Sequence, residues 1–278
     1  MTKQNKGTLL IMDLDSLVFQ VGWAFKDQLN LIGAAAARKA TDKTIEYALR
    51  TTGATHYIGF YGQEGGRKTF RHEFATLRIY KGQRKSEEWS NFFRTVIKDH
   101  FRDKWNAYGL LELEADDAIT VAYEEYKEDY KCIIYGQDKD MLQMAPFVRF
   151  NNIKRMFEGF KKEEGRKFFW SQCLHGDTGD NIEGIPGVGS GKKGGITSKN
   201  KIVQALWAME DPSEEEMFQH VQQAYINKFG EDYLYNLVEN YILLYMVKKP
   251  CMDYPKNPVL HTFTIEERVE TAEELLDL

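Results

Sequence analysis

Short apolar runs alternate with longer amphipathic segments over the first half of this chain. Such runs are typical of buried strands, and apolar residues at helical spacing are typical of helices that pack on a sheet. Their alternation predicts an α/β fold with a mostly parallel central sheet and helices on both faces. The expected strands are 9–13, 56–62, 110–113, 131–136 and 147–151. The expected helices are one that begins near residue 17, then 33–53, 89–104 and 115–130.

Helical patterns replace the strand pattern from about Phe169 onward, and a glycine-rich turn over 184–195 interrupts them. We therefore expect an α/β domain over 1–168 and a helical subdomain over 169–278. The tail after Pro250 is expected to be a loosely packed extension with one acidic helix. The expected C-terminal helices are 170–176, 199–209, 214–230 and 232–247.

Acidic residues gather in four clusters, and the first three follow expected strands. Ligands of parallel sheets bind beyond the carboxyl ends of the strands, so these acids should share one edge of the fold. Two carboxylates about 4 Å apart repel each other by roughly 4 kcal/mol at an effective dielectric near 20. Hard divalent cations with oxygen ligands would neutralise such a cluster. The clusters are Asp13 and Asp15; Glu114, Asp116 and Asp117; Asp138 and Asp140; and Asp177 and Asp180.

Each acidic motif alone also has a structural interpretation. Glu114 and Asp117 are three residues apart at an expected helix start, where the helix dipole favours acids whatever their function. Asp138 and Asp140 share one side of an extended segment, but DKD is also common in turns. Only the combination of these motifs therefore supports a functional site.

Charge is distributed unevenly although the net charge is −5. Residues 67–104 contain eleven Lys or Arg against five acids, a local balance of +6, whereas 266–278 contains six acids and one arginine. Separated charges of this kind suit a polyanion that approaches an acidic centre, although 67–104 could also be a solvated helix face. The three cysteines show no disulfide spacing, which predicts a reducing cytoplasm. No apolar run is long enough to span a bilayer and the N-terminus does not resemble a signal peptide, so we expect no membrane association.

Two further motifs are suited to phosphate. The segment YKGQRK gathers cations around Tyr80, whose ring could stack on an exposed base. In GIPGVGSGKK, glycine backbone can approach phosphate closely and the lysines add positive charge. A nucleotide-binding loop would require a preceding strand and a Lys-Ser/Thr ending, which this segment lacks. A structural turn is the remaining alternative. The candidate residues of this turn are Gly187, Gly189, Gly191, Lys192 and Lys193.

The order of these motifs resembles the 5′-nuclease superfamily, which includes bacteriophage 5′→3′ exonucleases, flap endonucleases and the 5′-nuclease domain of bacterial DNA polymerase I. MDLDSLVF is followed by FR, YKGQR, EADD, DKDMLQ and GDTGDNIEGIPGVGSGKK, and the resemblance spans roughly Leu9 to Lys201. It implies a PIN-like catalytic domain with a basic helical arch at about 75–104 and a helix–hairpin–helix element in the helical part. It also implies hydrolysis of phosphodiester bonds in DNA replication or repair.

Site residues can be carried over from the resemblance position by position. Lys81 and Arg84 match the catalytic cations at the base of the arch, Tyr80 matches a stacking tyrosine, and Arg71 of the FR pair is assigned to DNA binding. The family has an aspartate just past the second strand, which this chain lacks; Glu64 is the candidate substitute. The implied metal ligands are Asp13, Glu114, Asp116, Asp117, Asp138, Asp140, Asp177 and Asp180, of which Asp13, Asp116 and Asp138 are also assigned as catalytic.

The same resemblance implies the cofactors and partners. Two Mg²⁺ or Mn²⁺ ions are expected at the acids and a K⁺ ion at the glycine hairpin. The expected partner is DNA with a 5′ end, a flap or a single-strand/duplex junction, with RNA–DNA hybrids as a further substrate. We expect a stand-alone monomer in the cytoplasm, or in the host cytoplasm if the protein is viral.

Two alternatives remain open. LLIMDLDSL also resembles aspartate-nucleophile phosphatases of the haloacid dehalogenase type, although that interpretation leaves EADD, YKGQR and the glycine hairpin unused. A non-catalytic, structure-specific DNA-binding protein is the other, favoured by the absent second-strand aspartate. Cleavage of a labelled flap duplex with magnesium, compared with a small phosphomonoester, would distinguish the three.

Overall fold

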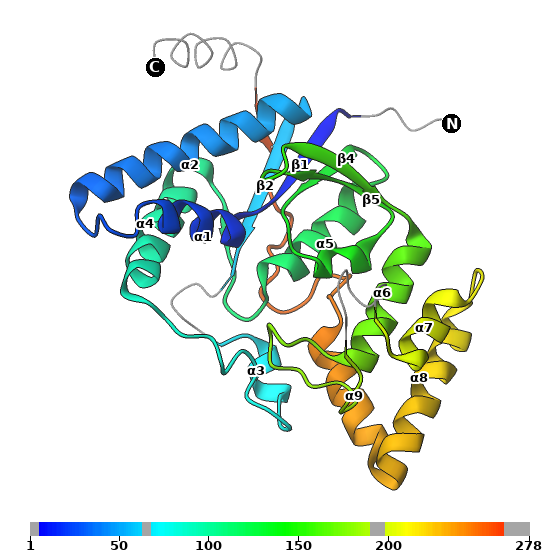
Figure 1. Ribbon diagram of the computed structural model, residues 1–278. Coiled ribbons are helices and arrows are strands. Elements are labelled where there is room, and N and C mark those ends of the chain that lie inside the picture. Colours follow the sequence, from blue (N-terminus) through cyan, green and yellow to red (C-terminus); the bar gives the residue numbers. More distant parts are fainter. Residues whose placement is uncertain (1–5, 63–67, 190–197, 264–278) are drawn as a thin grey trace.

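A seven-stranded sheet forms the centre of the computed structural model, which describes residues 6–62, 68–189 and 198–263 (Figure 1). The strand order is β3-β2-β1-β4-β5-β6, and β7 pairs with β2. The first five strands are parallel, whereas β6 and β7 run antiparallel to their neighbours. The predicted mostly parallel sheet is therefore confirmed. The strands are β1 (Thr8–Asp13), β2 (His56–Tyr61), β3 (Tyr108–Gly109), β4 (Lys131–Tyr135), β5 (Phe147–Asn151), β6 (Met156–Phe160) and β7 (His261–Thr262).

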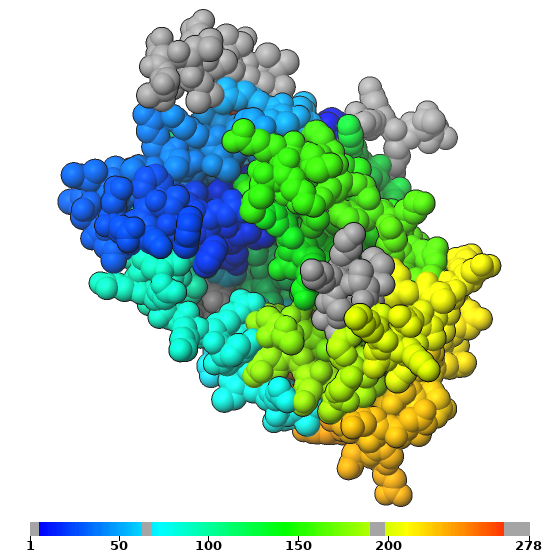
Figure 2. Space-filling model, in the orientation of Figure 1, coloured from blue at the N-terminus to red at the C-terminus, as the bar shows by residue number. Residues whose placement is uncertain are grey.

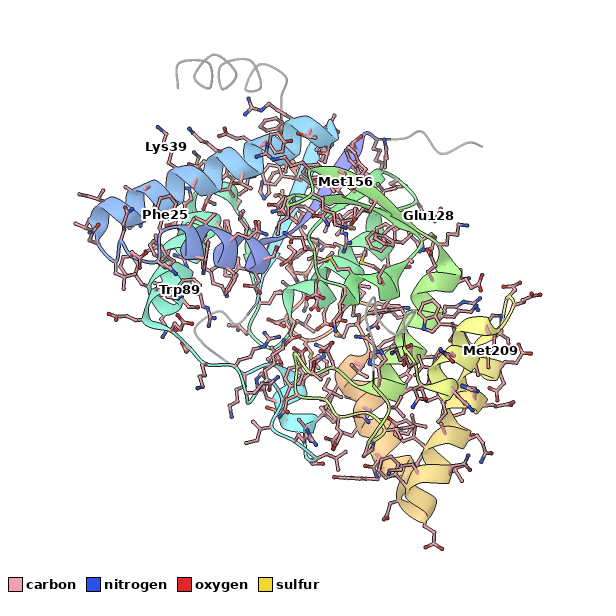
Figure 3. The ribbon with its side chains drawn as sticks, viewed as in Figure 1. Phe25, Lys39, Trp89, Glu128, Met156 and Met209 are labelled. Carbon is pink, nitrogen blue, oxygen red and sulfur yellow. The ribbon has the colours of Figure 1, made fainter. Side chains whose placement is uncertain are left out.

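Both faces of the sheet are covered, which explains why residues 9–12 of β1 are all apolar. Because side chains alternate along a strand, Leu10 and Met12 pack with α1, α2 and α4, while Leu9 and Ile11 pack with α5. The covering helices are α1 (Leu14–Ala24), α2 (Leu31–Thr52), α4 (Glu88–Trp105) and α5 (Ala115–Tyr126). Phe25 and Trp89 close the edge of the first core, and Lys39 lies on the solvent side of α2 (Figure 3).

A third apolar core holds the helical part together and is separate from the two cores on the sheet. Phe169 and Trp170 of α6 pack there against α8, α9 and the residue that follows α9 through aromatic contacts with ring centroids 5.2–5.9 Å apart. The elements of this part are α3 (Phe70–Phe74), α6 (Lys162–His175), α7 (Lys201–Ala208), α8 (Glu214–Phe229) and α9 (Tyr233–Leu244), with the 3-10 turn η3 (Gly230–Asp232). A second 3-10 turn, η2 (Asp140–Met144), packs Met141 and Met144 into the sheet core beneath α5. No helix of the described segments combines the length and the apolar character that crossing a membrane requires.

The structure corrects two predictions about strands. Residues 110–113 form no strand, because the carboxylate of Asp253 accepts hydrogen bonds from the backbone N–H groups of Leu111, Glu112 and Leu113 and holds them as a bend. The antiparallel strand β6 was not predicted. Its side chains are mostly exposed or half-buried, so it lacks the apolar run that reveals the central strands.

The segment after Pro250 is better packed than predicted. Tyr254 is buried in the core beneath α5, and β7 adds to the edge of β2. The expected acidic helix after residue 263 lies outside the described residues.

The arch expected over about 75–104 stays a prediction; its helix, α4, covers only Glu88–Trp105. Residues 75–87 contain turns rather than a helix, and α4 packs against α1 through Phe93, Ile97 and Phe101, all fully buried. The proposed boundary at 168/169 stays a prediction; α6 runs continuously across it.

A buried ion pair joins the sheet domain to the helical part. Arg71 of α3 is 2% exposed and makes two hydrogen bonds to the carboxylate of Asp117 on α5, at 2.6 and 2.8 Å. The same guanidinium donates to the backbone carbonyls of Leu243 and Tyr245 at the end of α9, at 2.9 and 2.8 Å. Every partner is matched in charge or hydrogen bonding, which is the condition under which a buried charge is tolerated.

Replacing Asp117 with Asn should lower the free energy of unfolding by about 3–5 kcal/mol, because the buried Arg71 guanidinium loses its bidentate counter-ion and keeps only Glu114 Oε2 at 3.6 Å. The matched control is Glu124→Gln, which breaks the half-exposed Lys127–Glu124 pair and should cost less than about 1 kcal/mol. Urea unfolding followed by circular dichroism measures both. Equal losses would contradict the role given to the buried pair.

Candidate active site

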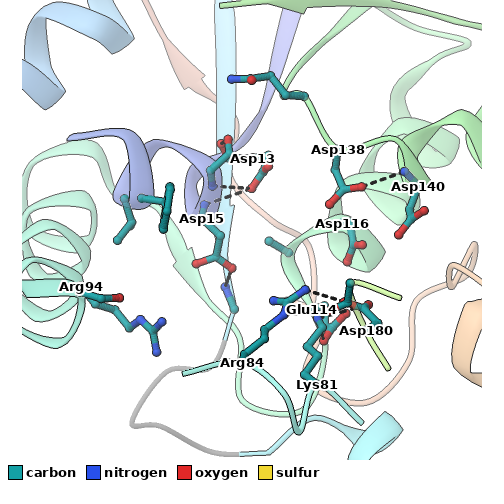
Figure 4. Close-up of a pocket in the computed structure, with 18 of the residues that line it drawn as sticks. Asp13, Asp15, Lys81, Arg84, Arg94, Glu114, Asp116, Asp138, Asp140 and Asp180 are labelled. Atoms are coloured by element: carbon teal, nitrogen blue, oxygen red, sulfur yellow. Dashed lines mark hydrogen bonds and ion pairs between the residues drawn. The ribbon is translucent and has the colours of Figure 1, made fainter. Parts of the chain in front are cut away.

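A cavity of about 540 Å³ opens at the carboxyl ends of β1 and β4, where eight carboxylates gather (Figure 4). The surface is recessed where the blue, cyan and green segments meet in Figure 2. The structure thus brings all four acidic clusters of the sequence to one place. The eight are Asp13, Asp15, Glu114, Asp116, Asp138, Asp140, Asp177 and Asp180.

Strand ends and helix starts position the acids of the first clusters. Asp13 ends β1 and is the N-cap of α1, where its Oδ1 accepts hydrogen bonds from the backbone N–H groups of Asp15 and Ser16 at 3.0 and 3.4 Å. Glu114 is the N-cap of α5, and Asp116 lies in its first turn. These acids therefore both stabilise the starts of helices and line the cavity.

A tight loop after α6 carries Asp177 and Asp180. The backbone folds so closely that a Cβ on Gly184 would lie 2.3 Å from the backbone nitrogen of Gly176, and one on Gly176 would lie 2.2 Å from the Ile182 carbonyl oxygen. Both glycines also have a positive φ, which is +71° at Gly176 and +64° at Gly184. These two glycines shape the loop; both lie in the motif GDTGDNIEGIPGVGSGKK, but neither was given a role of its own from the sequence.

Burial and mutual repulsion act on the acids together. Burial, followed by the negative charges of Asp15 and Asp138, raises the pKa of Asp13 to about 7. Burial and the neighbouring Asp138 raise the pKa of Asp140 to about 8. Burial, Asp117 and Glu114 raise the pKa of Asp116 well above its usual range. The cavity therefore disfavours the full ionisation of its own carboxylates.

Lysine and arginine side chains neutralise part of this charge. Lys81 Nζ lies 2.5 Å from Glu114 Oε1 and 3.7 Å from Asp180 Oδ2. Arg84 donates to Asp180 Oδ1 at 2.5 Å. Burial alone would raise the pKa of Glu114, but the charges of Lys81 and Arg71 lower it.

Three further cations at the cavity were not singled out by sequence reasoning. Lys139, between the two aspartates of DKD, lies 2.5 Å from Asp177 Oδ2. Lys98 lies 3.2 Å from Asp15 Oδ1, and Arg94 lines the cavity one helical turn before it. The signal available in the sequence was the spacing of four residues between Arg94 and Lys98, which places them on one face of a helix.

The donor set fits divalent cations in its chemistry. Carboxylate oxygens are hard ligands, and a cation would relieve the repulsion that raises the pKa of Asp13, Asp116 and Asp140. Among the described residues, however, no three His, Cys, Asp or Glu side chains lie in a ready-made coordination arrangement. The acids are instead held by the cations around them, so metal binding requires several of these ion pairs to rearrange.

Two predicted DNA-binding side chains have other partners. Tyr80 is 3% exposed, and its hydroxyl donates to Asp180 Oδ2 at 2.9 Å, with Glu114 Oε2 at 3.1 Å. Its ring is therefore not available to stack on a base. Arg71 is buried against Asp117, so neither residue can contact phosphate, and Asp117 does not line the cavity. These assignments are corrected by the packing of the loop against α5 and α9.

The glycine hairpin is described only in part. Gly187 adopts φ +87° and Gly189 accepts a hydrogen bond from the Ser198 hydroxyl at 2.6 Å. Gly191, Lys192 and Lys193 lie outside the described residues, as does Glu64. Their predicted roles, and the K⁺ ion expected at the hairpin, stay predictions.

Comparisons with known proteins agree with this geometry. Residues 8–167 match the family model for the 5′-3′ exonuclease N-terminal resolvase-like domain. A 5′-3′ exonuclease of Mycoplasmopsis pulmonis is 28% identical over 141 residues, which cover 46% of each chain. DNA polymerase I of Bacillus subtilis is 31% identical over 144 residues, 45% of this chain and 16% of the polymerase. The chain thus spans less than half the length of these two relatives.

Solved structures share the fold. A bacteriophage T5 protein co-crystallised with metal ions superimposes with a TM-score of 0.56 at 19% identity, covering 85% of this chain and 99% of the other. The bacteriophage T5 flap endonuclease in a complex with DNA and metal ions gives 0.52 at 22% identity, covering 85% and 98%. These likenesses extend beyond the matched N-terminal domain into the helical part.

Replacing Asp13 with Asn should change how stability depends on pH. Because the folded protein raises the pKa of Asp13 to about 7, the stability contributed by its protonated form is complete below about pH 4 and is lost as the pH rises to 7. Asn retains the helix cap but does not ionise. In EDTA, the melting temperature of the variant should therefore rise relative to wild type between pH 4 and 7. If the melting temperatures of the variant and of wild type changed with pH in parallel across that range, the raised pKa of Asp13 would be contradicted.

Proposed function

The chain belongs to the 5′-3′ exonuclease family, and from this premise we propose that it hydrolyses phosphodiester bonds at the 5′ ends or flaps of DNA in a reaction that depends on divalent metal ions. The observation that carries the proposal is the convergence of eight carboxylates on one cavity, with five cations around them, at the edge of the family-matched domain. Substrate phosphate and metal ions would both find their ligands there.

The carboxylates act as ligands rather than as nucleophiles in this proposal. When bound, two Mg²⁺ or Mn²⁺ ions supply Lewis acidity and an activated water for in-line attack on the phosphate. The side chains that would hold them are Asp13, Glu114, Asp116, Asp138, Asp140, Asp177 and Asp180. Asp117 is left out because its two oxygens are bound to Arg71.

Lys81 and Arg84 supply positive charge where negative charge develops in the transition state. Both currently pair with acids of the cavity, and Lys81 is mostly buried while Arg84 is largely exposed. Arg84 can therefore turn toward an arriving phosphate at low cost, whereas Lys81 stays fixed beside Glu114. We assign Lys81 to the reacting phosphate and Arg84 to capture of the strand.

DNA is the proposed substrate because its backbone matches the cationic rim formed by Arg84, Arg94 and Lys98. Action on RNA–DNA hybrids, a K⁺ ion at the hairpin, a monomeric state and a role in replication or repair are further parts of the proposal. The phosphatase alternative requires Asp13 as a nucleophile with Asp15 beside it. Asp15 instead accepts the Gly62 backbone N–H at 2.8 Å and pairs with Lys98, and the family match sets this alternative aside.

Replacing Asp116 with Asn should abolish cleavage of a 5′-labelled flap duplex, by about 1000-fold or more, which corresponds to about 4 kcal/mol of transition-state stabilisation. DNA affinity, measured by fluorescence anisotropy in Ca²⁺, should change by less than about threefold because phosphate contacts provide it. The control is Asp211→Asn, a side chain that is 94% exposed and outside the cavity. Turnover of the Asp116 variant at the wild-type rate would contradict the proposal.

Replacing Arg94 with Ala should weaken DNA binding and reduce the slope of log affinity against log salt concentration by about 1, since one phosphate contact is lost. Arg38→Ala, an exposed arginine of α2 that does not line the cavity, is the matched control. Identical salt slopes for both variants would exclude Arg94 from the strand path.

A further inference from the structure

Two buried glutamines connect the acidic cavity to the chain segment that follows α9. Gln172 of α6 is fully buried, and its Nε2 donates to Asp140 Oδ1 at 2.5 Å. Its Oε1 accepts from Gln143 Nε2 at 3.0 Å. Gln143 Nε2 also donates to the Leu244 carbonyl at 2.8 Å, and its Oε1 accepts from the Met246 backbone N–H at 3.2 Å.

Backbone groups determine which atom of each amide faces which neighbour. The Met246 N–H can only donate, so Gln143 must present its Oε1 there and its Nε2 to the Leu244 carbonyl and to Gln172. Gln172 must then present Oε1 to Gln143, which leaves Nε2 for Asp140. The chain of hydrogen bonds therefore directs a donor, and never an acceptor, at the Asp140 carboxylate.

We propose that Gln172, oriented by Gln143, is a positioning residue that fixes the Asp140 carboxylate for metal binding; this inference rests on the proposed function. With Oδ1 held by the amide, rotation about the Asp140 Cβ–Cγ bond is restricted, and the place of the other oxygen at the cavity is set. The backbone N–H of Asp140 is itself tied to Asp138 Oδ1 at 2.8 Å, so side chain and main chain are both constrained (Figure 4).

Stability alone does not account for this arrangement. Gln143 is 6% exposed and Gln172 is fully buried, and burying an amide gains free energy only when its hydrogen bonds are made. Methionine has nearly the same length and would fill the same space without that requirement. A polar chain that ends on an acid of the cavity is the arrangement expected of residues that orient a ligand; losing such residues commonly costs about 10- to 100-fold in metal affinity or activity.

The test compares Gln172→Met and Gln143→Met with wild type. Mn²⁺ binding is measured by electron paramagnetic resonance without DNA, at a temperature where circular dichroism shows each protein folded. Mn²⁺ affinity should fall about tenfold or more in Gln172→Met and by a smaller factor in Gln143→Met, which only frees the orientation of Gln172. In cleavage of the flap duplex, the Mg²⁺ concentration for half-maximal rate should rise by the same factors, while KM for DNA is retained.

Asn240→Leu is the matched control, because it removes another buried amide of the helical part. Its Nδ2 donates to the Tyr225 hydroxyl at 2.7 Å, away from the acids. It should lose stability yet bind Mn²⁺ as wild type does. Mn²⁺ affinity in Gln172→Met equal to that of wild type, or loss of the fold in both glutamine variants, would give the amides a purely structural role and overturn the inference.

Measurements on the wild-type protein distinguish failure of the positioning role from failure of the proposed function. Mn²⁺ binding and cleavage by wild type, with no change in either glutamine variant, overturns the positioning role alone. Failure of wild type to bind Mn²⁺ or to cut the duplex overturns the proposed function, and the inference with it.

Discussion

Eight carboxylates share one cavity at the carboxyl end of the sheet, and their mutual repulsion shapes most of what surrounds them. The parallel strands β1 and β4 deliver two clusters to this edge, and the start of α5 and the loop after α6 deliver the others. Once desolvated, these groups disfavour each other's charge, as the raised pKa values of Asp13 and Asp140 show. The fold tolerates the arrangement because lysines and arginines from three different segments reach into the same space.

Those cations bear directly on the proposed reaction. Lys81, Arg84 and Lys139 each pair with an acid at 2.5 Å, so they occupy the carboxylates that metal ions would need. A nucleic-acid backbone that enters the cavity offers these cations a replacement partner. Substrate and metal would thus support each other's binding, since phosphate draws the cations away from the acids while the metal ions take over their neutralisation.

Patterns local in the chain were predictable, whereas those that depend on distant partners were not. The central strands, the helix expected over 33–53 and the gathering of acids at strand ends all follow from periodicity and from the rule for parallel sheets. Tyr80 and Arg71 were misassigned because their partners lie up to 174 residues away, beyond what a local motif indicates. The bend at 110–113 was not predicted for the same reason, because the carboxylate that accepts its backbone hydrogen bonds belongs to Asp253.

The buried guanidinium of Arg71 shows how far the family-matched residues 8–167 depend on the rest of the chain. Its acceptors lie on both sides of residue 167, where the family match ends: one carboxylate before it and two main-chain oxygens near residue 244. A fragment that ended there would lose those two oxygens and strand β7. It would also lose the Asp253 carboxylate that accepts hydrogen bonds from the bend at 110–113. The family-matched residues 8–167 therefore depend on contacts with residues that follow them in the chain. A transplant of residues 8–167 into another protein would keep these contacts only if it also carried the segments around residues 243–245, Asp253 and β7.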